Sequence, residues 1–316
     1  MQDKLTSIDE LPEEILVEVA QYLPNSGLIN LAKTKMYHCT LFNPMINMRK
    51  ISYFLQNVVC GNHEIVTSML QKDIRLIFNK GRVTDCSGRT FDNISGFEYA
   101  LWALDKHIWT KMIACIPRNE EGGKVFENLI TQYTKVNKDG VTYRLNGKTI
   151  TENHFDFETT IIKELQTQVE LVNAPGAINW DDAKSQWIEG VGGAQKLLPI
   201  HVVYEYCADE NFYLVPEFSS QPKLSKQFYN WITSKEENWF SVDFKLGIEF
   251  AIFKASVGCA AAEEPHGSPG VVATRDLDAI TELYQVRSKD FINLKSQLED
   301  LVTKDNHHQV VVAIYQ

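Results

Sequence analysis

The sequence has few cysteines, and none of them is spaced like a metal site or a redox motif. No two are separated by two residues, and none is paired with histidine at the spacing of a zinc site. Scattered thiols are typical of proteins in a reducing compartment, so we expect a cytoplasmic protein that needs no cofactor and no metal. The six cysteines are Cys39, Cys60, Cys86, Cys115, Cys207 and Cys259.

Positive charge and long apolar runs are also scarce. The chain has 31 Lys and Arg residues against 41 Asp and Glu residues, a formal net charge of -10 at pH 7, and no basic cluster stands out. Such an acidic chain has no overall attraction to nucleic acid or anionic lipid. No apolar run reaches the roughly 18 residues of a membrane span, and the first residues do not resemble a secretory signal. We therefore expect a soluble protein without nucleic acid or membrane partners.

The chain has ample material for a core. Hydrophobic residues make up 44% of its 316 residues and aromatic residues 11%. At roughly 150 residues per domain, this length predicts about two domains.

The beginning of the chain, residues 7–23, predicts a helix preceded by its entry signal. Pro12 suits the first helical position, and the carboxylates that follow it suit the positive end of the helix dipole. Four apolar residues recur at helical spacing and form one face: Ile15, Leu16, Val19 and Leu23. Pro24 then ends the helix.

Two further short helices are predicted before residue 45. One carries Leu28 and Leu31, and the next carries Tyr37 and runs to a break at Asn43-Pro44. Three short helices cannot cover this apolar surface among themselves. Either the rest of the chain covers it, as the start of a larger core, or another protein does.

These residues match a known pattern in order and spacing. The matching positions are Leu11, Pro12, Glu14, Ile15, Leu16, Val19, Tyr22, Leu23, Pro24, Leu28, Leu31, Ala32, Lys35 and Tyr37. The segment resembles the F-box, with Tyr37 at the position where the family usually has tryptophan. The resemblance implies that the helices dock on the Skp adaptor of a cullin–RING ubiquitin ligase. It implies a Skp-binding set of Leu11, Pro12, Ile15, Leu16, Val19, Leu23, Pro24, Leu28, Leu31 and Tyr37.

The segment that follows resembles divergent ankyrin repeats. Residues 61–66, Gly-Asn-His-Glu-Ile-Val, are similar to the start of the repeat's second helix, and residues 85–90 are similar to its hairpin turn. Residues 97–104 and 109–113 then match the next pair of helices, provided that residues 91–96 are an insertion. The resemblance implies a short helical stack whose surface binds another protein.

The C-terminal half predicts a mixture of helices and strands. Asn146-Gly147, between two β-prone segments, is typical of a type I′ hairpin. Residues 277–301 carry leucines at helical spacing and predict an amphipathic helix. The apolar stretch 244–262 predicts a buried helix, and residues 308–315 predict a terminal strand. Residues 190–207 resemble C-terminal regions of ankyrin-containing proteins that intracellular bacterial pathogens secrete, which implies an effector acting in the host cytosol.

Residues with chemical potential in this half do not form a recognisable active site. The glycines at 190–193 lack the Gly-Lys-Ser/Thr ending of a phosphate-binding loop, so helix termination or close packing is favoured. His201 or His266 with Cys207 or Cys259 leaves open a thiol hydrolase, which needs a base within hydrogen-bond reach of the thiol. Buried thiols with satisfied or solvated histidines are the alternative.

We therefore predict a mainly α fold in three parts. These are an F-box over 1–48, divergent ankyrin-like repeats over 49–116, and an α-rich α+β domain with a β-hairpin over 117–316. The predicted function is that of a non-catalytic F-box subunit that brings an unidentified target protein to the ubiquitin ligase through residues 49–316. The alternatives are an enzyme in the C-terminal domain that the F-box delivers, and a scaffold without any ligase role.

Overall fold

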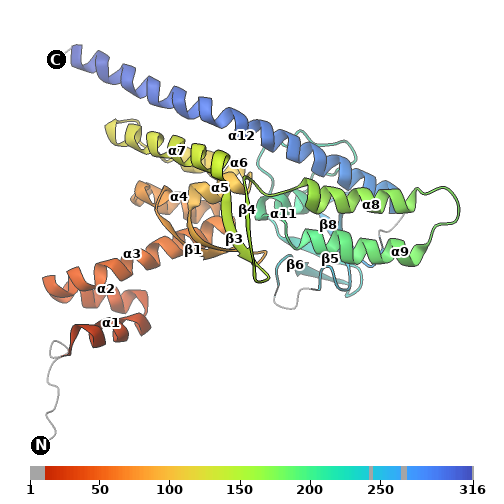
Figure 1. Cartoon of the computed structure of the whole chain (residues 1–316), viewed down its shortest axis with the longest axis horizontal. Coiled ribbons are helices and arrows are strands. Elements are labelled where there is room, and N and C mark those ends of the chain that lie inside the picture. The colour runs from red at the N-terminus through yellow and green to blue at the C-terminus, as the bar shows by residue number, and fades with distance from the viewer. Residues whose placement is uncertain (1–10, 242–244, 265–268, 315–316) are drawn as a thin grey trace, which may run out of the picture.

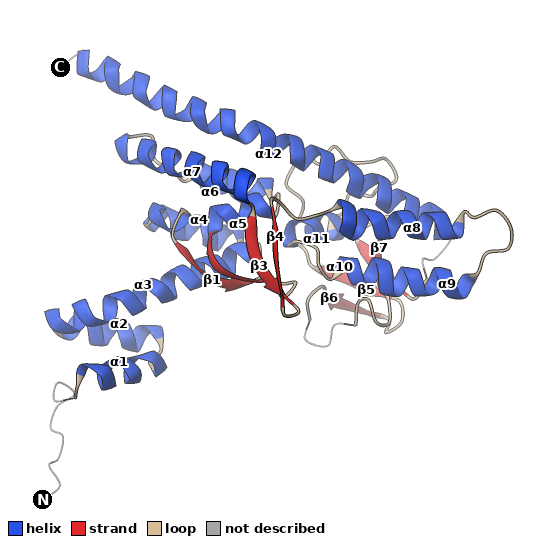
Figure 2. Ribbon diagram, viewed as in Figure 1, coloured by secondary structure: helices blue, strands red, loops and turns tan. Residues whose placement is uncertain are grey.

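The computed structural model describes residues 11–241, 245–264 and 269–314, with side chains as far as residue 303 in the last helix. It confirms a mainly helical α+β fold, with helices around two four-stranded sheets (Figures 1 and 2). The first helices lie apart from the body at one end, and a long last helix runs along the other side (Figure 1). The first predicted helix is shorter than expected, because it begins at Glu13, one residue after Pro12, and ends at Tyr22. Residues 7–10 of that prediction lie outside the described residues.

Three helices form an N-terminal module with its own small core. They are α1 (Glu13–Tyr22), α2 (Asn25–Thr34) and the first part of α3 (Met36–Val59). The core of this module consists of Leu16, Ala20, Leu28, Ala32 and Phe42, flanked by Leu11, Leu23, Leu31, Leu41, Met45 and Ile46. The main core begins with Ile51 and Phe54 on the same helix, so the two cores separate between residues 46 and 51.

The predicted helix break at Asn43-Pro44 is wrong. The helix α3 continues through Pro44, which lies inside it and is exposed. Proline removes one backbone hydrogen bond and crowds the preceding turn. The helix persists because Phe42 packs in the module and Phe54 packs in the main core, which holds both halves in helical conformation.

Two helix pairs flank the first hairpin of the body. The second half of α3 packs on α4 (His63–Lys72), and α5 (Gly96–Trp102) packs on α6 (Lys106–Ala114). Between the pairs run β1 (Lys80–Thr84) and β2 (Thr90–Ser95), and β2 occupies the residues expected to be an insertion. In space α3 lies against α5 and α4 lies against α6, so the second pair stacks on the first.

The first sheet joins two hairpins in the order β1-β2-β3-β4, with all neighbours antiparallel. Strands β3 (Val141–Leu145) and β4 (Lys148–Glu152) form the second hairpin. Its turn has φ 50° at Asn146 and φ 76° at Gly147, both in the left-handed region that a type I′ turn requires, which confirms the predicted hairpin. The two hairpins pair at one register position only, Thr90 with Arg144.

The rest of the body contains further helices and a second sheet. The helices are α7 (Glu120–Asp139), α8 (Lys163–Val172), α9 (Trp180–Ser185), α10 (Gly193–Gln195) and α11 (Ile200–Cys207), with π-helical turns at Glu158–Ile162 and Gln186–Gly192. The second sheet has the order β6-β5-β8-β7. Its strands are β5 (Gln227–Asn230), β6 (Lys235–Asn238), β7 (Ala251–Lys254) and β8 (Cys259–Ala262).

The predicted buried helix over 244–262 is wrong, because this stretch contains the hairpin of β7 and β8. Both strands are buried at every position, so the apolar run has no alternation that distinguishes a strand from a buried helix. Gly258, with φ 66°, lies in the turn between them. Residue 244 itself lies outside the described residues.

The last helix, α12 (Pro269–Ile314), packs along α7 and α8 (Figure 1). It confirms the amphipathic helix predicted over 277–301, with Leu283, Leu294 and Leu298 buried. The terminal strand predicted over 308–315 is wrong as far as Ile314, because α12 continues to that residue. The β-branched residues there favour a strand only weakly when they extend an existing helix. Residue 315 lies outside the described residues.

Candidate partner-docking surface

The outward face of α1 carries an exposed apolar stripe. Pro12, Ile15, Val19 and Tyr22 follow one another three or four residues apart, which places them on one side of the helix. Ile15 is 42% exposed, Val19 43% and Tyr22 83%. The opposite face buries Leu16 and Ala20 in the module core. The helix therefore has two apolar faces, one covered by the module and one open.

The first turn of α3 extends this surface. Tyr37 is half exposed, and its hydroxyl donates a hydrogen bond to a Glu13 carboxylate oxygen at 3.3 Å. This contact places the start of α3 beside the start of α1. Burial and the nearby Glu13 carboxylate raise the pKa of Tyr37, which is therefore neutral near pH 7. Met36, 82% exposed, lies next to it. We call Pro12, Ile15, Val19, Tyr22, Met36 and Tyr37 the open apolar surface.

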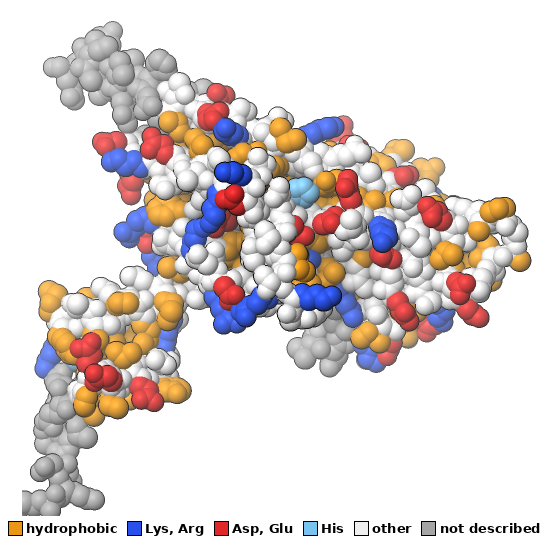
Figure 3. All heavy atoms as spheres, viewed as in Figure 1, with side chains coloured by type: hydrophobic (Ala, Val, Ile, Leu, Met, Phe, Trp, Pro, Cys, Tyr) orange, Lys and Arg blue, Asp and Glu red, His pale blue; other side chains and the backbone are white. Residues whose placement is uncertain are grey.

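The predicted Skp-binding residues fall into three groups in the structure. Leu16 and Leu28 are buried in the module core, so they shape the module from inside. Leu11, Leu23 and Leu31 are half buried at its edge. The remaining residues are exposed: Pro12, Ile15, Val19, Pro24 and Tyr37. Apolar side chains also gather over this module in the space-filling view (Figure 3).

Arg49 links the helices of the module, a role that no local sequence pattern indicates. Its guanidinium donates hydrogen bonds to the carbonyl oxygens of Ala20, Gln21 and Leu23 at 3.2, 2.7 and 2.7 Å. It also donates to the Asn25 side-chain oxygen at 3.1 Å. The cation thus caps the C-terminal end of α1, where the helix dipole favours positive charge. A contact across more than 20 residues leaves no local pattern in the sequence.

The thiols predicted as an alternative catalytic site are buried. The sulfur atoms of Cys207 and Cys259 lie 2.9 Å apart, and burial raises the pKa of the Cys259 thiol. His201 makes its hydrogen bond to the Ala103 carbonyl oxygen at 2.7 Å, and burial lowers its pKa to about 3. Its other ring nitrogen, Nδ1, is buried and has no hydrogen-bond partner among the described residues, so the ring is not bonded to either thiol as a base would have to be. His266 lies outside the described residues.

The glycine run at 190–193 serves close packing. A Cβ atom on Gly192 would lie 2.8 Å from the backbone nitrogen of Gly247 and 2.8 Å from the carbonyl oxygen of Phe250. Only glycine allows the π-helical turn to approach the second sheet this closely. Close packing rather than phosphate binding explains this motif. Within the described parts of the chain, no cluster of three or more His, Cys, Asp or Glu residues has the geometry of a metal site.

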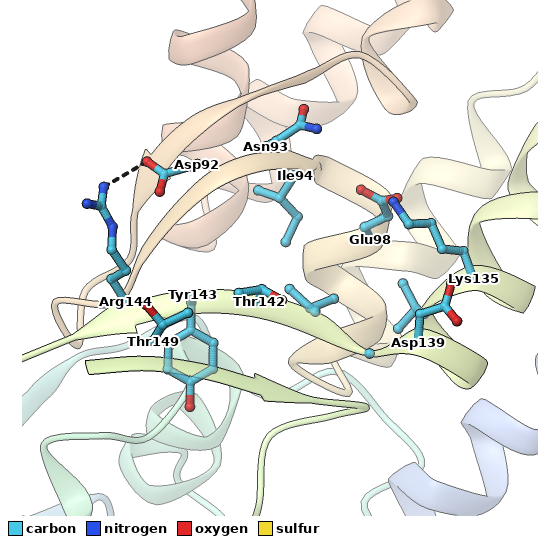
Figure 4. Close-up of a pocket in the computed structure, with 13 residues that line it drawn as sticks. Asp92, Asn93, Ile94, Glu98, Lys135, Asp139, Thr142, Tyr143, Arg144 and Thr149 are labelled. Carbon is cyan, nitrogen blue, oxygen red and sulfur yellow. Dashed lines mark hydrogen bonds and ion pairs between the residues drawn. The ribbon is translucent and has the colours of Figure 1, made fainter. Parts of the chain in front are cut away.

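A polar hollow of about 380 Å³ lies where the two hairpins of the first sheet diverge (Figure 4). Its walls come from β2, the start of α5, the C-terminal end of α7, and the hairpin of β3 and β4. Arg144 on β3 donates to Asp92 on β2 at 2.9 Å, which closes one end of the hollow. Glu98 on the floor pairs with Lys80. With most of its charges paired, the hollow offers hydrogen-bonding groups rather than a strong net charge.

Comparison with known proteins supplies a family but no activity. The chain is 36% identical over 277 residues to the uncharacterised protein CBUA0006 of Coxiella burnetii (strain RSA 493 / Nine Mile phase I), and the match covers 81% of this chain and 77% of that protein. The chain belongs to the CBUA0006 family. The model of the CBUA0006 C-terminal domain matches residues 160–298. No solved structure matches the chain.

The family model covers α8, the second sheet and most of α12. The buried Cys207 and Cys259 lie within it, whereas the open apolar surface and Arg49 lie before it. No helix in the described ranges is long and apolar enough to cross a membrane.

Proposed function

We propose that this chain is an F-box substrate receptor. In this proposal the N-terminal module docks on the Skp adaptor of a cullin–RING ubiquitin ligase, and residues 49–316 hold a target protein. The chain itself performs no catalysis. The observation that carries the proposal is the separate module, with its own small core and an open apolar surface that no other part of the described chain covers.

The energetics of this surface support a partner. Ile15 and Val19 point outward from a module whose core has only five buried apolar residues. Burying one such aliphatic side chain in an interface contributes roughly 1.5–3 kcal/mol. Exposed apolar residues that form a continuous patch mark interaction sites more often than isolated ones do. Ile15 and Val19 are also residues that the F-box resemblance assigns to the adaptor.

The continuous helix α3 supports a receptor role. It spans 24 residues, a length of roughly 36 Å, and its two halves belong to the module and to the main core. A helix fixed at both ends holds the two parts in one orientation. A target bound on the body would therefore be held at a defined distance from the adaptor, which raises its effective concentration near the ligase.

We also propose that residues 49–116 form two divergent ankyrin-like repeats. The order of elements supports this, because a helix pair, a hairpin and a second helix pair follow one another along the chain. The stacking of α5 on α3 and of α6 on α4 is the arrangement that repeats adopt when they share one core. The polar hollow of Figure 4 lies beside this stack and is a candidate surface for the target.

The relative in Coxiella burnetii supports a role as a bacterial effector. Skp adaptors and cullin–RING ligases are components of eukaryotic cells. A bacterial F-box protein therefore finds its adaptor only inside a host. We propose that the chain acts in the host cytosol after secretion.

The proposal is tested by exchanging outward residues for carboxylates. In the double variant Ile15→Glu, Val19→Glu both side chains point away from the module core, so we expect the fold to be retained. Two carboxylates buried against an adaptor would weaken binding by roughly 100-fold or more. The measurement is co-purification of Skp with the tagged chain from eukaryotic cells, with circular dichroism as the check on folding.

The matched control is Ile292→Glu, which changes a side chain 68% exposed on α12. We expect it to co-purify Skp as the wild type does. The double variant Leu11→Ala, Pro12→Ala is a second test at the edge of the same surface. If the wild type does not co-purify Skp, or the Ile15/Val19 variant retains it fully, the proposal is wrong. Skp binding without ubiquitin chains on co-purified targets would indicate a scaffold instead.

A further inference from the structure

Two half-buried cysteines from distant parts of the chain face each other. Cys60 ends α3, and Cys86 lies in the turn between β1 and β2. Their sulfur atoms are 3.7 Å apart, and the Cys86 thiol donates toward the Cys60 sulfur. The amide of Gln56 donates to the same Cys60 sulfur at 3.1 Å. Cys60 therefore receives two hydrogen bonds, which is the environment of a thiolate rather than a thiol.

Hydrogen bonds hold the backbone in place at both cysteines. The Cys60 carbonyl oxygen accepts hydrogen bonds from the Tyr204 hydroxyl at 3.2 Å and from the Lys226 ammonium at 3.0 Å. The turn that carries Cys86 is closed by the Asp85 carboxylate, which accepts from the backbone nitrogens of Ser87 and Arg89. The backbone around the two cysteines would therefore lose little conformational freedom when a disulfide forms.

The electrostatic environment shifts the pKa values of the two thiols in opposite directions. The hydrogen bond from Cys86, helped by Gln56 and the Lys226 charge, lowers the pKa of Cys60 to about 6 against the opposing effect of burial. The same hydrogen bond, together with burial, raises the pKa of Cys86. At neutral pH the pair thus holds one thiolate and one thiol. A partly accessible thiolate beside a second thiol is the arrangement of peroxide-sensitive cysteines.

We propose that Cys60 and Cys86 are an oxidation site at which hydrogen peroxide forms a reversible disulfide. The Cys60 thiolate attacks one peroxide oxygen, the O–O bond breaks, and hydroxide leaves and takes up a proton. Cys60 is then a sulfenic acid, oxidised by two electrons. The Cys86 sulfur attacks the Cys60 sulfur, the S–O bond breaks, and water leaves with the Cys86 proton. Two thiols and one peroxide thus give one disulfide and two waters.

The geometry needs only a small adjustment. A disulfide has an S–S distance of about 2.05 Å, so the sulfurs must approach by about 1.6 Å through side-chain rotation. Oxidation of Cys60 also removes the negative charge that raises the pKa of Cys86, which makes the second thiol a better nucleophile for the second step. The product would fasten the end of α3 to the first hairpin.

The test is a peptide map of the intact, reduced chain after brief treatment with hydrogen peroxide and blocking of free thiols. Trypsin releases Cys60 in residues 51–72 and Cys86 in residues 83–89. We expect these two peptides to be joined, and to separate after dithiothreitol. The buried Cys207–Cys259 pair is the internal comparison, with peptides 197–223 and 255–275, and we expect it to remain reduced because peroxide does not reach it.

A variant isolates the first step. In Cys86→Ser the sulfenic acid on Cys60 has no thiol to attack it, so dimedone should label Cys60. The serine hydroxyl replaces the thiol as a donor to Cys60, and the Gln56 amide and the Lys226 charge remain, so labelling should be roughly tenfold faster than at the half-buried Cys39 or Cys115. Absence of the 51–72 to 83–89 link in the wild type overturns the proposal. Equal labelling of Cys60, Cys39 and Cys115 also overturns it.

Discussion

Arg49 holds together the part of the chain that we assign to the adaptor. Its hydrogen bonds reach the end of α1 and the start of α2, so this side chain adds to the core packing of Leu16 and Ala20 in holding α1 on the module. Hydrogen bonds from a charged donor contribute about 1.5–3 kcal/mol each when they are partly buried, and their sum is not additive. Arg49 therefore helps to keep the open apolar surface in its observed shape.

We predict that Arg49→Ala destabilises the module by about 2 kcal/mol and leaves the main core unchanged. The loss should appear as faster hydrogen exchange of the α1 amides in the native state, measured by mass spectrometry. Arg82→Ala is the control, because Arg82 is largely exposed in its ion pair with Asp92 and contributes little. If α1 exchanges equally fast in Arg49→Ala and Arg82→Ala, the Arg49 hydrogen bonds do not stabilise the module.

Asp276 makes the stability of the chain depend on pH. Burial raises the pKa of this carboxyl on α12 to about 8, and its oxygens accept from the Lys254 backbone nitrogen. The folded pKa is above the unfolded value of 3.8, so the folded state binds the proton more tightly. Its contribution to stability is present below pH 3.8 and is lost as the pH rises toward 8.

We therefore predict that Asp276→Asn stabilises the chain at pH 8 by about 1–3 kcal/mol, since the amide keeps an acceptor oxygen and does not ionise. The gain should shrink as the pH approaches 4. Urea unfolding of both proteins at pH 4.5 and pH 8 measures it. A constant difference between the proteins across this range would contradict the role of Asp276 ionisation.

At the scale of elements, the helices and turns that local sequence signals determine could be predicted from the sequence. The Asn146-Gly147 turn and the amphipathic helix over 277–301 depend on conformational preference and periodicity, and both were predicted correctly. The stretch 244–262 was predicted incorrectly because strands buried on both faces have no periodic signal. Arg49 and the facing of Cys60 and Cys86 depend on contacts between distant residues, which no local pattern contains.

The helix α3 shows how tertiary contacts override a local signal. Pro44 normally ends a helix, yet α3 passes through it because apolar residues on both sides pack into separate cores. The same helix carries Cys60 at its end and Tyr37 at its start. Its continuity therefore connects the proposed adaptor surface with the oxidation site.

We predict that Pro44→Ala stabilises the chain by about 1–2 kcal/mol, because it restores a backbone donor and removes the clash in an exposed part of the helix. The measurement is the midpoint of thermal unfolding followed by circular dichroism. The exposed neighbour Asn43, changed to Ala, provides the control for general helix propensity. Destabilisation by Pro44→Ala would indicate that the proline maintains a break, which is contrary to a continuous α3.

At the scale of the whole molecule, one core joins residues from Ile51 to Val302, and the N-terminal module stands outside it. The helix α12 closes this core. Its buried Arg287 donates to the Phe218 carbonyl oxygen at 2.9 Å, to Glu205 at 3.1 Å and to the His107 ring at 2.8 Å. The body thus has one hydrophobic core that extends from the predicted repeats to the C-terminal domain, separate from the core of the module.

The separation of the module core from the main core is the basis of the proposed receptor role. A module that is not needed to complete the main core has its apolar surface free for an adaptor, and a body with one core forms a stable platform for a target. The match to the CBUA0006 relative covers 81% of this chain, so the same proposal can be tested on that protein.

The most direct test of the central claim is titration calorimetry of the purified full-length chain with a purified Skp adaptor. We predict saturable one-to-one binding with a Kd of about 1 µM or tighter, and loss of the signal in the Ile15→Glu, Val19→Glu variant. Absence of binding by the folded wild-type chain at an adaptor concentration of about 100 µM would contradict the account.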